Sequence, residues 1–186
     1  MGDEASPRYN SIWIDNLATM VDALSKYRST KNYNLFENPK YIKMYTVYPS
    51  LVLAGTHTAQ IGDTGNVADL TITGGIARNL TAFEELSKIR LKTTDEGEKA
   101  EIARQMKILA DFVYMQNGYT TEGLEEQMSV FSSDPESIKA EIKEYAEDSE
   151  AKSELLAGFG FAVLRDGGKY KSASASTSKN NRRDYW

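Results

Sequence analysis

Apolar residues recur three and four positions apart over most of residues 11–149, and this spacing predicts a mainly helical chain. The first predicted helix runs from Ser11 to Tyr27, where the spacing holds after an initial gap of five. Ser6-Pro7 suits its start, because proline is tolerated in a first helical turn. One buried face is expected to contain Ile12, Leu17, Met20, Val21, Leu24 and Tyr27.

A second, more deeply buried helix is predicted to begin at Asn38-Pro39. Its apolar residues are dense enough for burial nearly all round: Ile42, Met44, Tyr45, Val47, Tyr48, Leu51 and Val52. Pro49 falls inside this run and is expected to kink or divide the helix, because proline lacks the backbone N–H and its ring clashes with the preceding turn.

Three further helices follow a long polar loop at Gly55–Gly75, a length more typical of a functional loop than of a simple connection. The first covers Ile76–Ile89. The next covers Glu98–Met115 and ends at Asn117-Gly118, because these residues readily adopt a left-handed backbone. Asp134 and Pro135 are predicted to cap and begin the last one. The expected buried stripe of the Glu98–Met115 helix is Ile102, Met106, Leu109, Phe112 and Val113.

The pattern changes after Ser153 and predicts strands. Leu155–Leu164 is short, contains glycines and is rich in Phe, Val and Leu, which favours a buried strand. Asp166-Gly167-Gly168 indicates a turn, and Lys169–Thr177 alternates with a period of two, although its serines also suit a flexible linker. Asp184-Tyr185-Trp186 is typical of the start of another strand.

The predicted architecture is therefore mainly α, with about five helices arranged as hairpins and a few antiparallel strands after them. We assign residues 1–153 to a helical domain and residues 154–186 to the start of an antiparallel β domain. Two or three strands lack the partners for an independent sheet. We therefore expect the β domain to be incomplete and its strands to allow self-association.

Composition excludes several classes of function. The chain has no cysteine, which rules out disulfides and thiolate metal sites, and its single histidine argues against a metal site. No cofactor is expected. The net charge of −5 argues against nucleic acid as a partner. No apolar run approaches the roughly 20 residues that span a bilayer, so no membrane segment is expected.

Three short motifs carry a resemblance to a known enzyme family. They are Glu4-x-Ser6-Pro7-x-Tyr9, Gly62-Asp63-Thr64-Gly65 and Gly160-Phe161-Ala162-Val163-Leu164-Arg165. In this order they resemble the later part of a heparinase II/III-type polysaccharide lyase. The resemblance implies helix hairpins of an incomplete α/α toroid followed by the first strands of a β-sandwich.

The resemblance also implies an activity, β-elimination of a glycan that contains uronic acid, such as a heparin-like glycosaminoglycan or alginate. It implies a periplasmic or secreted parent protein and an acidic polysaccharide or oligosaccharide as partner. In similar lyases, an Asn or His that neutralises the uronate carboxylate lies before the tyrosine motif, and a further His lies in the β domain. Because this sequence has neither, we expect the isolated chain to be inactive.

Tyr9 is the residue that the motif identifies with the catalytic tyrosine. A phenol can take or give a proton, but its reference pKa of about 10 must be lowered by a cation before it acts as a base near neutrality. The alternative is a tyrosine that only packs at the start of a helix. Arg8, Asn10 and Trp13 are expected to line the same cleft, Trp13 as a platform for a sugar ring or else as a core residue.

Asp63 and His57 are the candidates in the polar loop. Glycines beside Asp63 let the backbone turn tightly, so its carboxylate either accepts hydrogen bonds from sugar hydroxyls or caps the loop's own amides. A histidine titrates near neutrality, but a lone imidazole offers no ligand set, and we interpret His57 as a loop or helix-end residue.

A rival hypothesis is a helical carbohydrate-binding or scaffold module without chemistry. The two hypotheses differ in what removal of the Tyr9 hydroxyl does. A binding module keeps its affinity for sugar, whereas a lyase segment loses turnover in its parent enzyme and keeps binding.

Overall fold

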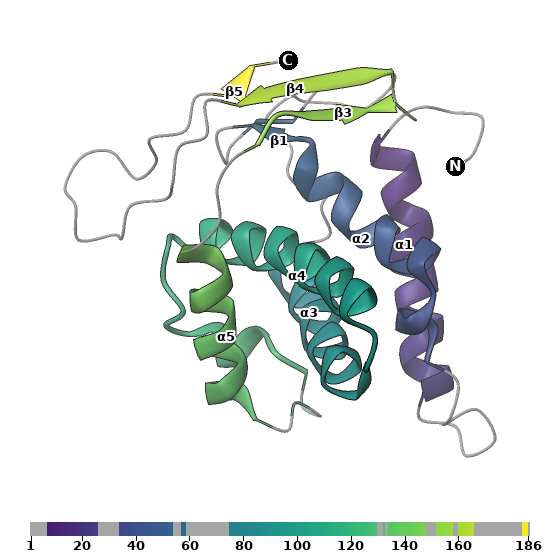
Figure 1. Ribbon diagram of the computed structural model, residues 1–186, viewed down its shortest axis with the longest axis vertical. Helices are drawn as coiled ribbons and strands as arrows, with labels where there is room; N and C mark the ends of the chain where they lie inside the picture. Colours follow the sequence, from purple (N-terminus) through teal and green to yellow (C-terminus); the bar gives the residue numbers. More distant parts are fainter. Residues whose placement is uncertain are drawn as a thin grey trace.

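The computed structural model describes residues 7–25, 34–53, 57–58, 75–129, 132, 134–147, 152–157, 160–165 and 184–185. Within them the fold is mainly helical, with strands gathered at one end (Figure 1). The helices are α1 (Pro7–Ser25), α2 (Pro39–Ser50), α3 (Gly75–Lys92), α4 (Glu96–Gln116) and α5 (Pro135–Glu147), with short 3-10 turns η1 (Leu35–Glu37) and η3 (Leu124–Gln127). The strands are β1 (Val52–Leu53), β2 (His57–Thr58), β3 (Glu154–Leu156), β4 (Phe161–Arg165) and β5 (Asp184–Tyr185).

Local signals in the sequence set most helix ends. α1 begins at Pro7, and α2 and α5 each have proline as their first residue, as predicted. The side-chain oxygens of Asn38, Asp95 and Asp134 each accept a backbone N–H from the first turn of α2, α4 and α5 respectively. These bonds satisfy donors that a helix leaves without intrahelical partners.

The end of α4 also confirms the sequence prediction. α4 stops at Gln116, and Asn117 donates its backbone N–H to the Val113 carbonyl. Gly118 has φ +73° and Tyr119 has φ +64°, so the left-handed backbone falls just after the asparagine. Tyr119 is a non-glycine residue in this region, and its N–H donates to the Tyr114 carbonyl at 2.8 Å.

The hydrophobic core is centred on α4. Its predicted stripe is buried at Met106, Leu109, Phe112 and Val113, and partly buried at Ile102. α3 packs along one side of α4, and α5 packs along another. They contribute these fully or nearly fully buried side chains: Leu80, Phe83 and Leu86 from α3, and Ile142 and Ala146 from α5.

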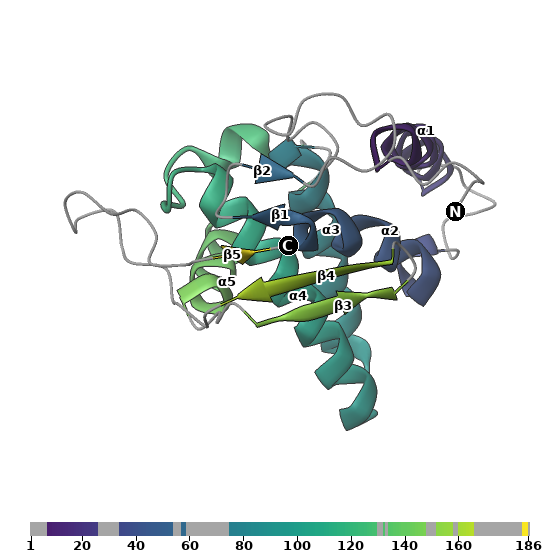
Figure 2. The ribbon, with the colours of Figure 1, turned by 90° about the horizontal axis from the view of Figure 1, so that it is seen from above.

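α1 lies at the margin of the helical layer, beside α2 and away from α5 in both views (Figures 1 and 2). Its predicted buried face is wrong except at Val21. Ile14 and Val21 are buried, whereas Ile12, Met20 and Leu24 are exposed and Leu17 is partly buried; Tyr27 lies outside the described residues. The reason is that α1 has two apolar stripes, and α2 covers only the one that contains Ile14 and Val21.

Pro49 ends α2 rather than kinking it. The helix continues for one residue to Ser50, and Leu51 then caps it before β1 begins. A proline in the last turn removes a single intrahelical N–H donor. Because the helix ends one residue later, this loss does not require a kink. Of the residues predicted to be buried here, Ile42, Tyr45, Tyr48, Leu51 and Val52 are buried, and Met44 and Val47 are partly buried.

The strands form two small antiparallel sheets, β1-β2 and β3-β4-β5. The prediction of one strand over Leu155–Leu164 is wrong, because the chain reverses at Gly160, which has φ +64°, and divides the segment into β3 and β4. β5 pairs with β4 at the predicted Asp184-Tyr185. The turn and strand predicted over residues 166–177 lie outside the described residues, as does most of the loop at 55–75, although β2 lies within it.

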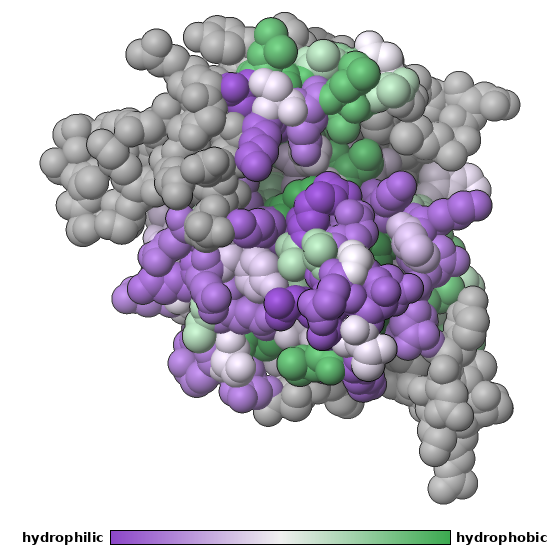
Figure 3. Space-filling view, viewed as in Figure 1, coloured by the Kyte–Doolittle hydropathy of each residue, from purple (hydrophilic) through white to green (hydrophobic). Residues whose placement is uncertain are grey.

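The two faces of the β3-β4-β5 sheet have different surroundings (Figure 2). Val163 is fully buried, and Leu156 and Phe161 pack against the helical core. Leu155 and Leu164 are 76% and 59% exposed on the other face, which contributes apolar surface at the strand end of the molecule (Figure 3). Self-association through these strands stays a prediction.

Hydrogen bonds from Arg165 connect this sheet to the helices. Its side chain is only 4% exposed. It donates to the Ser50 carbonyl at the end of α2 at 2.7 Å, to the Lys152 carbonyl at 3.0 Å and to the Glu154 carboxylate at 3.2 Å. A cation at the carbonyl end of α2 also interacts favourably with the helix dipole.

We predict that Arg165→Met lowers the free energy of unfolding by about 1.5–3 kcal/mol, the usual range for a hydrogen bond to a charged group, because methionine leaves the Ser50 carbonyl without this donor. Urea unfolding measures the loss. Arg104→Met is the matched control, since Arg104 forms an exposed ion pair with Glu101 and should cost at most about 1 kcal/mol. Equal losses for the two variants would show that Arg165 does not anchor the sheet.

Candidate functional site

The residues predicted to act on a glycan fall mostly on the start of α1. Arg8, Tyr9 and Asn10 occupy its first turn, and Trp13 follows one turn after Tyr9. The side chains of Arg8, Tyr9 and Asn10, and the whole of Asp63, lie outside the described part of the structure. The helix therefore brings four of the five predicted residues into one short segment.

Trp13 is 65% exposed, so its interpretation as a core residue is wrong. An exposed indole is a large flat apolar surface with one N–H donor, the kind of group against which a sugar ring stacks. Tyr9 and Trp13 are four residues apart, the spacing that places two residues on neighbouring turns of the same helical side.

Buried contacts hold an adjoining side of α1 against the rest of the helical layer. Ser11, Ile14 and Val21 are buried there. Asp15 of α1 forms an ion pair with Arg78, which lies in the first turns of α3. α1 is thus tied to α3 by charge and to α2 by apolar contact.

Arg78 lies over an aromatic cluster formed by η1 and α2. Its guanidinium carbon lies 5.8 Å from the centre of the Tyr45 ring, and only 9% of its side chain is exposed. The hydroxyls of Tyr45 and Tyr41 are hydrogen-bonded at 2.7 Å, and the Phe36 ring packs against both tyrosines. A guanidinium over a tyrosine ring is attracted by the ring's negative face, which helps to offset its removal from water.

The buried phenols of α2 do not provide a base at neutral pH. Burial raises the pKa of Tyr41 and of Tyr45, and it raises the pKa of Tyr48 to about 12, in each case against the opposing effect of the Arg78 charge. All three therefore remain protonated near pH 7, and we interpret them as structural supports of α1.

Arg78 and the tyrosines beside it were not among the residues predicted to form the site. Asp15 and Arg78 are 63 positions apart, so no local spacing connects them. The one available signal was Tyr41 and Tyr45 at a spacing of four in a helix predicted to be buried, since a buried tyrosine hydroxyl needs a partner.

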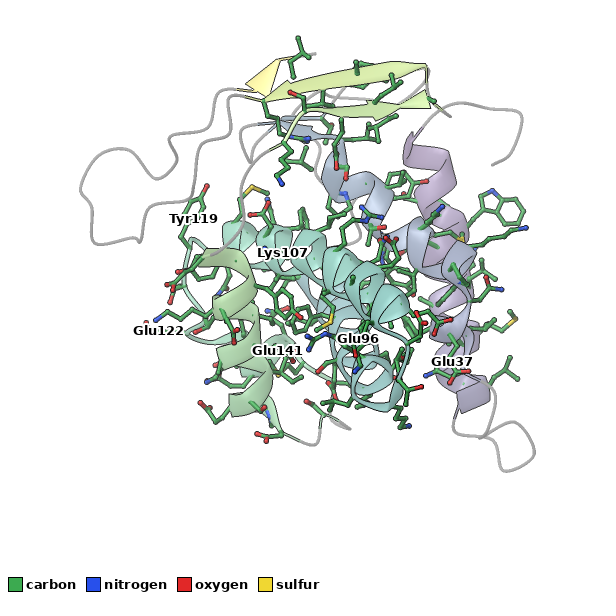
Figure 4. All side chains as sticks on the ribbon, in the orientation of Figure 1. Glu37, Glu96, Lys107, Tyr119, Glu122 and Glu141 are labelled. Carbon is green, nitrogen blue, oxygen red and sulfur yellow. The ribbon has the colours of Figure 1, made fainter. Side chains whose placement is uncertain are left out.

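Acidic side chains do not converge on a metal site in the part of the chain that the structure describes. Glu37, Glu96, Glu122 and Glu141 come from η1, α4, the turn after α4 and α5, and lie apart from one another (Figure 4). His57 belongs to β2, opposite Leu53 of β1, rather than to a loop or helix end. Its side chain lies outside the described part.

We predict that the fall in unfolding free energy at alkaline pH depends in part on the buried Tyr48. Its pKa in the folded chain, about 12, lies above the ordinary value of about 10 in the unfolded chain, so its stabilising contribution is complete below pH 10 and lost as the pH rises to 12. Tyr48→Phe should make the fall in unfolding free energy between pH 10 and 12 shallower by on the order of 2 kcal/mol. Urea unfolding at several pH values measures it; superimposable curves for the two proteins would contradict the assignment.

No family model, curated protein or solved structure matches this chain. Among the described helices, none combines the length and the apolar character needed to cross a membrane. The function is therefore inferred from the chain's own residues, chiefly the motif that leads into α1 and the exposed Trp13 of that helix.

Proposed function

We propose that this chain supplies part of a polysaccharide lyase that cleaves a uronic-acid-containing glycan by β-elimination. The observation that supports it best is the coincidence of the Glu4-x-Ser6-Pro7-x-Tyr9 motif with the start of α1, one turn before an exposed tryptophan. The resemblance to heparinase II/III-type lyases supplies the reaction. We place the parent protein, by the same resemblance, in the periplasm or outside the cell.

The reaction needs two proton transfers. A base removes the proton from the carbon that bears the uronate carboxylate, the bond from the neighbouring carbon to the glycosidic oxygen breaks, and a carbon–carbon double bond forms between them. An acid then protonates the departing oxygen. Tyr9 is our candidate for one or both transfers, and a phenol can serve as the acid without help from a cation.

Trp13 is assigned to binding rather than to chemistry. Its ring would stack on a sugar next to the bond that breaks, while Arg8, Asn10 and Asp63 would supply charge and hydrogen bonds to carboxylates and hydroxyls. The Asp15–Arg78 pair positions this helix and does not touch the glycan.

We also propose that the helices belong to an α/α toroid. Two features support this. α2 is buried nearly all round, as an inner helix would be, and α3 and α4 form a hairpin with only Thr93, Thr94 and Asp95 between them.

The exposure of Trp13 equally supports a carbohydrate-binding module without chemistry. Such a module would use the same indole and would not need the Tyr9 hydroxyl. Glycan binding measured at Trp13 therefore tests whether the ligand is a uronate glycan. Turnover measured after substitution of Tyr9 tests whether the protein carries out the elimination.

We predict that uronate oligosaccharides change the fluorescence of Trp13. The chain has two tryptophans, so Trp186→Phe leaves Trp13 as the only indole. In this variant, alginate or unsulfated heparin-like oligosaccharides should give a saturable change in emission, and neutral glucans of equal length should not. If no uronate glycan changes the emission of Trp13, both the lyase proposal and the binding-module proposal are contradicted.

We predict that Tyr9→Phe, in the full-length protein that contains this chain, lowers turnover by about 10² or more and leaves glycan binding nearly unchanged, as removal of a positioned acid or base does. The absorbance of the unsaturated uronate product measures turnover. Tyr145→Phe, at a partly buried tyrosine of α5, is the matched control. Full turnover by Tyr9→Phe would leave the binding module as the surviving proposal.

A further inference from the structure

The stripe of α1 that its own chain leaves uncovered has a regular spacing. Trp13, Leu17, Met20 and Leu24 follow one another at intervals of four, three and four residues, and all but the partly buried Leu17 are exposed. This is the a/d spacing of a helix that packs along another helix with side chains interdigitated. The occupant that fits it is therefore a second helix.

The surroundings of this stripe limit which helix can occupy it. The residues along its open flank are Asn16 and Ala23, both exposed and both uncharged. Ile14 and Val21, on the other flank, are already buried against the chain's own helices. This flank offers no charged side chain that could select a partner by charge. When two copies of the chain bring these flanks together, no like charges repel each other.

The spacing is also symmetrical about its midpoint, between Leu17 and Met20. If a second α1 runs antiparallel about a two-fold axis at that point, Leu17 falls opposite Met20, and Trp13 falls opposite Leu24. Each layer then pairs two different apolar side chains, with the large indole against a smaller leucine. From the symmetrical spacing and the uncharged flank we infer that two copies of this chain associate through antiparallel α1 helices.

This pairing goes beyond the proposed function and bears on it at one residue. Trp13 cannot stack on a sugar while it is packed against Leu24 of a second copy. Association and glycan binding should therefore compete, so that disrupting the pair leaves Trp13 free for the glycan.

Sedimentation velocity on the whole chain tests the association. We expect dimers at concentrations on the order of 100 μM, the range of a weak association through one helix pair. Met20→Glu should give monomers at every such concentration, because it places two carboxylates in the seam. Leu91→Glu is the matched control, since Leu91 is an 81% exposed apolar residue of α3 outside the stripe, and it should leave the dimer intact.

Cysteine cross-linking tests the orientation, and the cysteine-free chain makes it unambiguous. In the antiparallel pair, Trp13→Cys and Leu24→Cys chains should form a mixed disulfide when oxidised together. Leu24→Cys alone should not cross-link, because a rise of 1.5 Å per residue over the separation of positions 13 and 24 puts its two copies about 16 Å apart.

Each contrary result overturns the inference in a different way. A monomer at all concentrations excludes the association. A dimer that survives Met20→Glu but not Leu155→Glu moves the contact to the exposed face of β3 and β4. Efficient cross-linking of Leu24→Cys to itself means that the helices are parallel. None of these results depends on whether the chain binds a glycan, so failure of the proposed function would be separately visible.

Discussion

Two buried arginines hold the peripheral elements of this fold to α2. A guanidinium removed from water must find hydrogen-bond and charge partners, and both arginines find theirs on other elements. Arg78 of α3 lies over Tyr45 of α2 and pairs with Asp15 of α1. Arg165 of β4 donates to the last carbonyl of α2 and to the Glu154 carboxylate. α1 and the β3-β4-β5 sheet are thereby fixed to the middle and to the end of one buried helix.

The placement of α1 determines what the chain can offer to other molecules. Its inner side is taken up by Ile14, Val21 and the Asp15–Arg78 pair, so its Trp13 stripe has to face outward. Both proposals use that outward stripe, one for a sugar ring at Trp13 and one for a second α1. An exposed apolar surface of this kind on a helix is typical of an interaction site.

Signals between neighbouring residues made much of the helical layer predictable. Contacts between residues far apart in the sequence could not be predicted. Proline starts, Asx caps and the Asn117-Gly118 stop depend on neighbouring residues and were confirmed. The buried side of α1 was predicted wrongly except at Val21, because two apolar stripes overlap in its sequence and only packing selects one. Arg78 and Arg165 escaped prediction because their partners on α1 and α2 lie 63 and 115 positions away. Trp13 was singled out as a candidate from the sequence, but its exposure required the structure.

A double-mutant cycle on Asp15 and Arg78 tests most directly whether this pair holds α1 in place. Unfolding free energies would be measured for the parent chain, Asp15→Asn, Arg78→Met and the double variant. We predict a coupling of about 1 kcal/mol, between the values typical of exposed ion pairs and of buried charged hydrogen bonds, because Arg78 is buried while Asp15 is largely exposed. A coupling indistinguishable from zero would contradict it and leave the outward orientation of the Trp13 stripe without its principal cause.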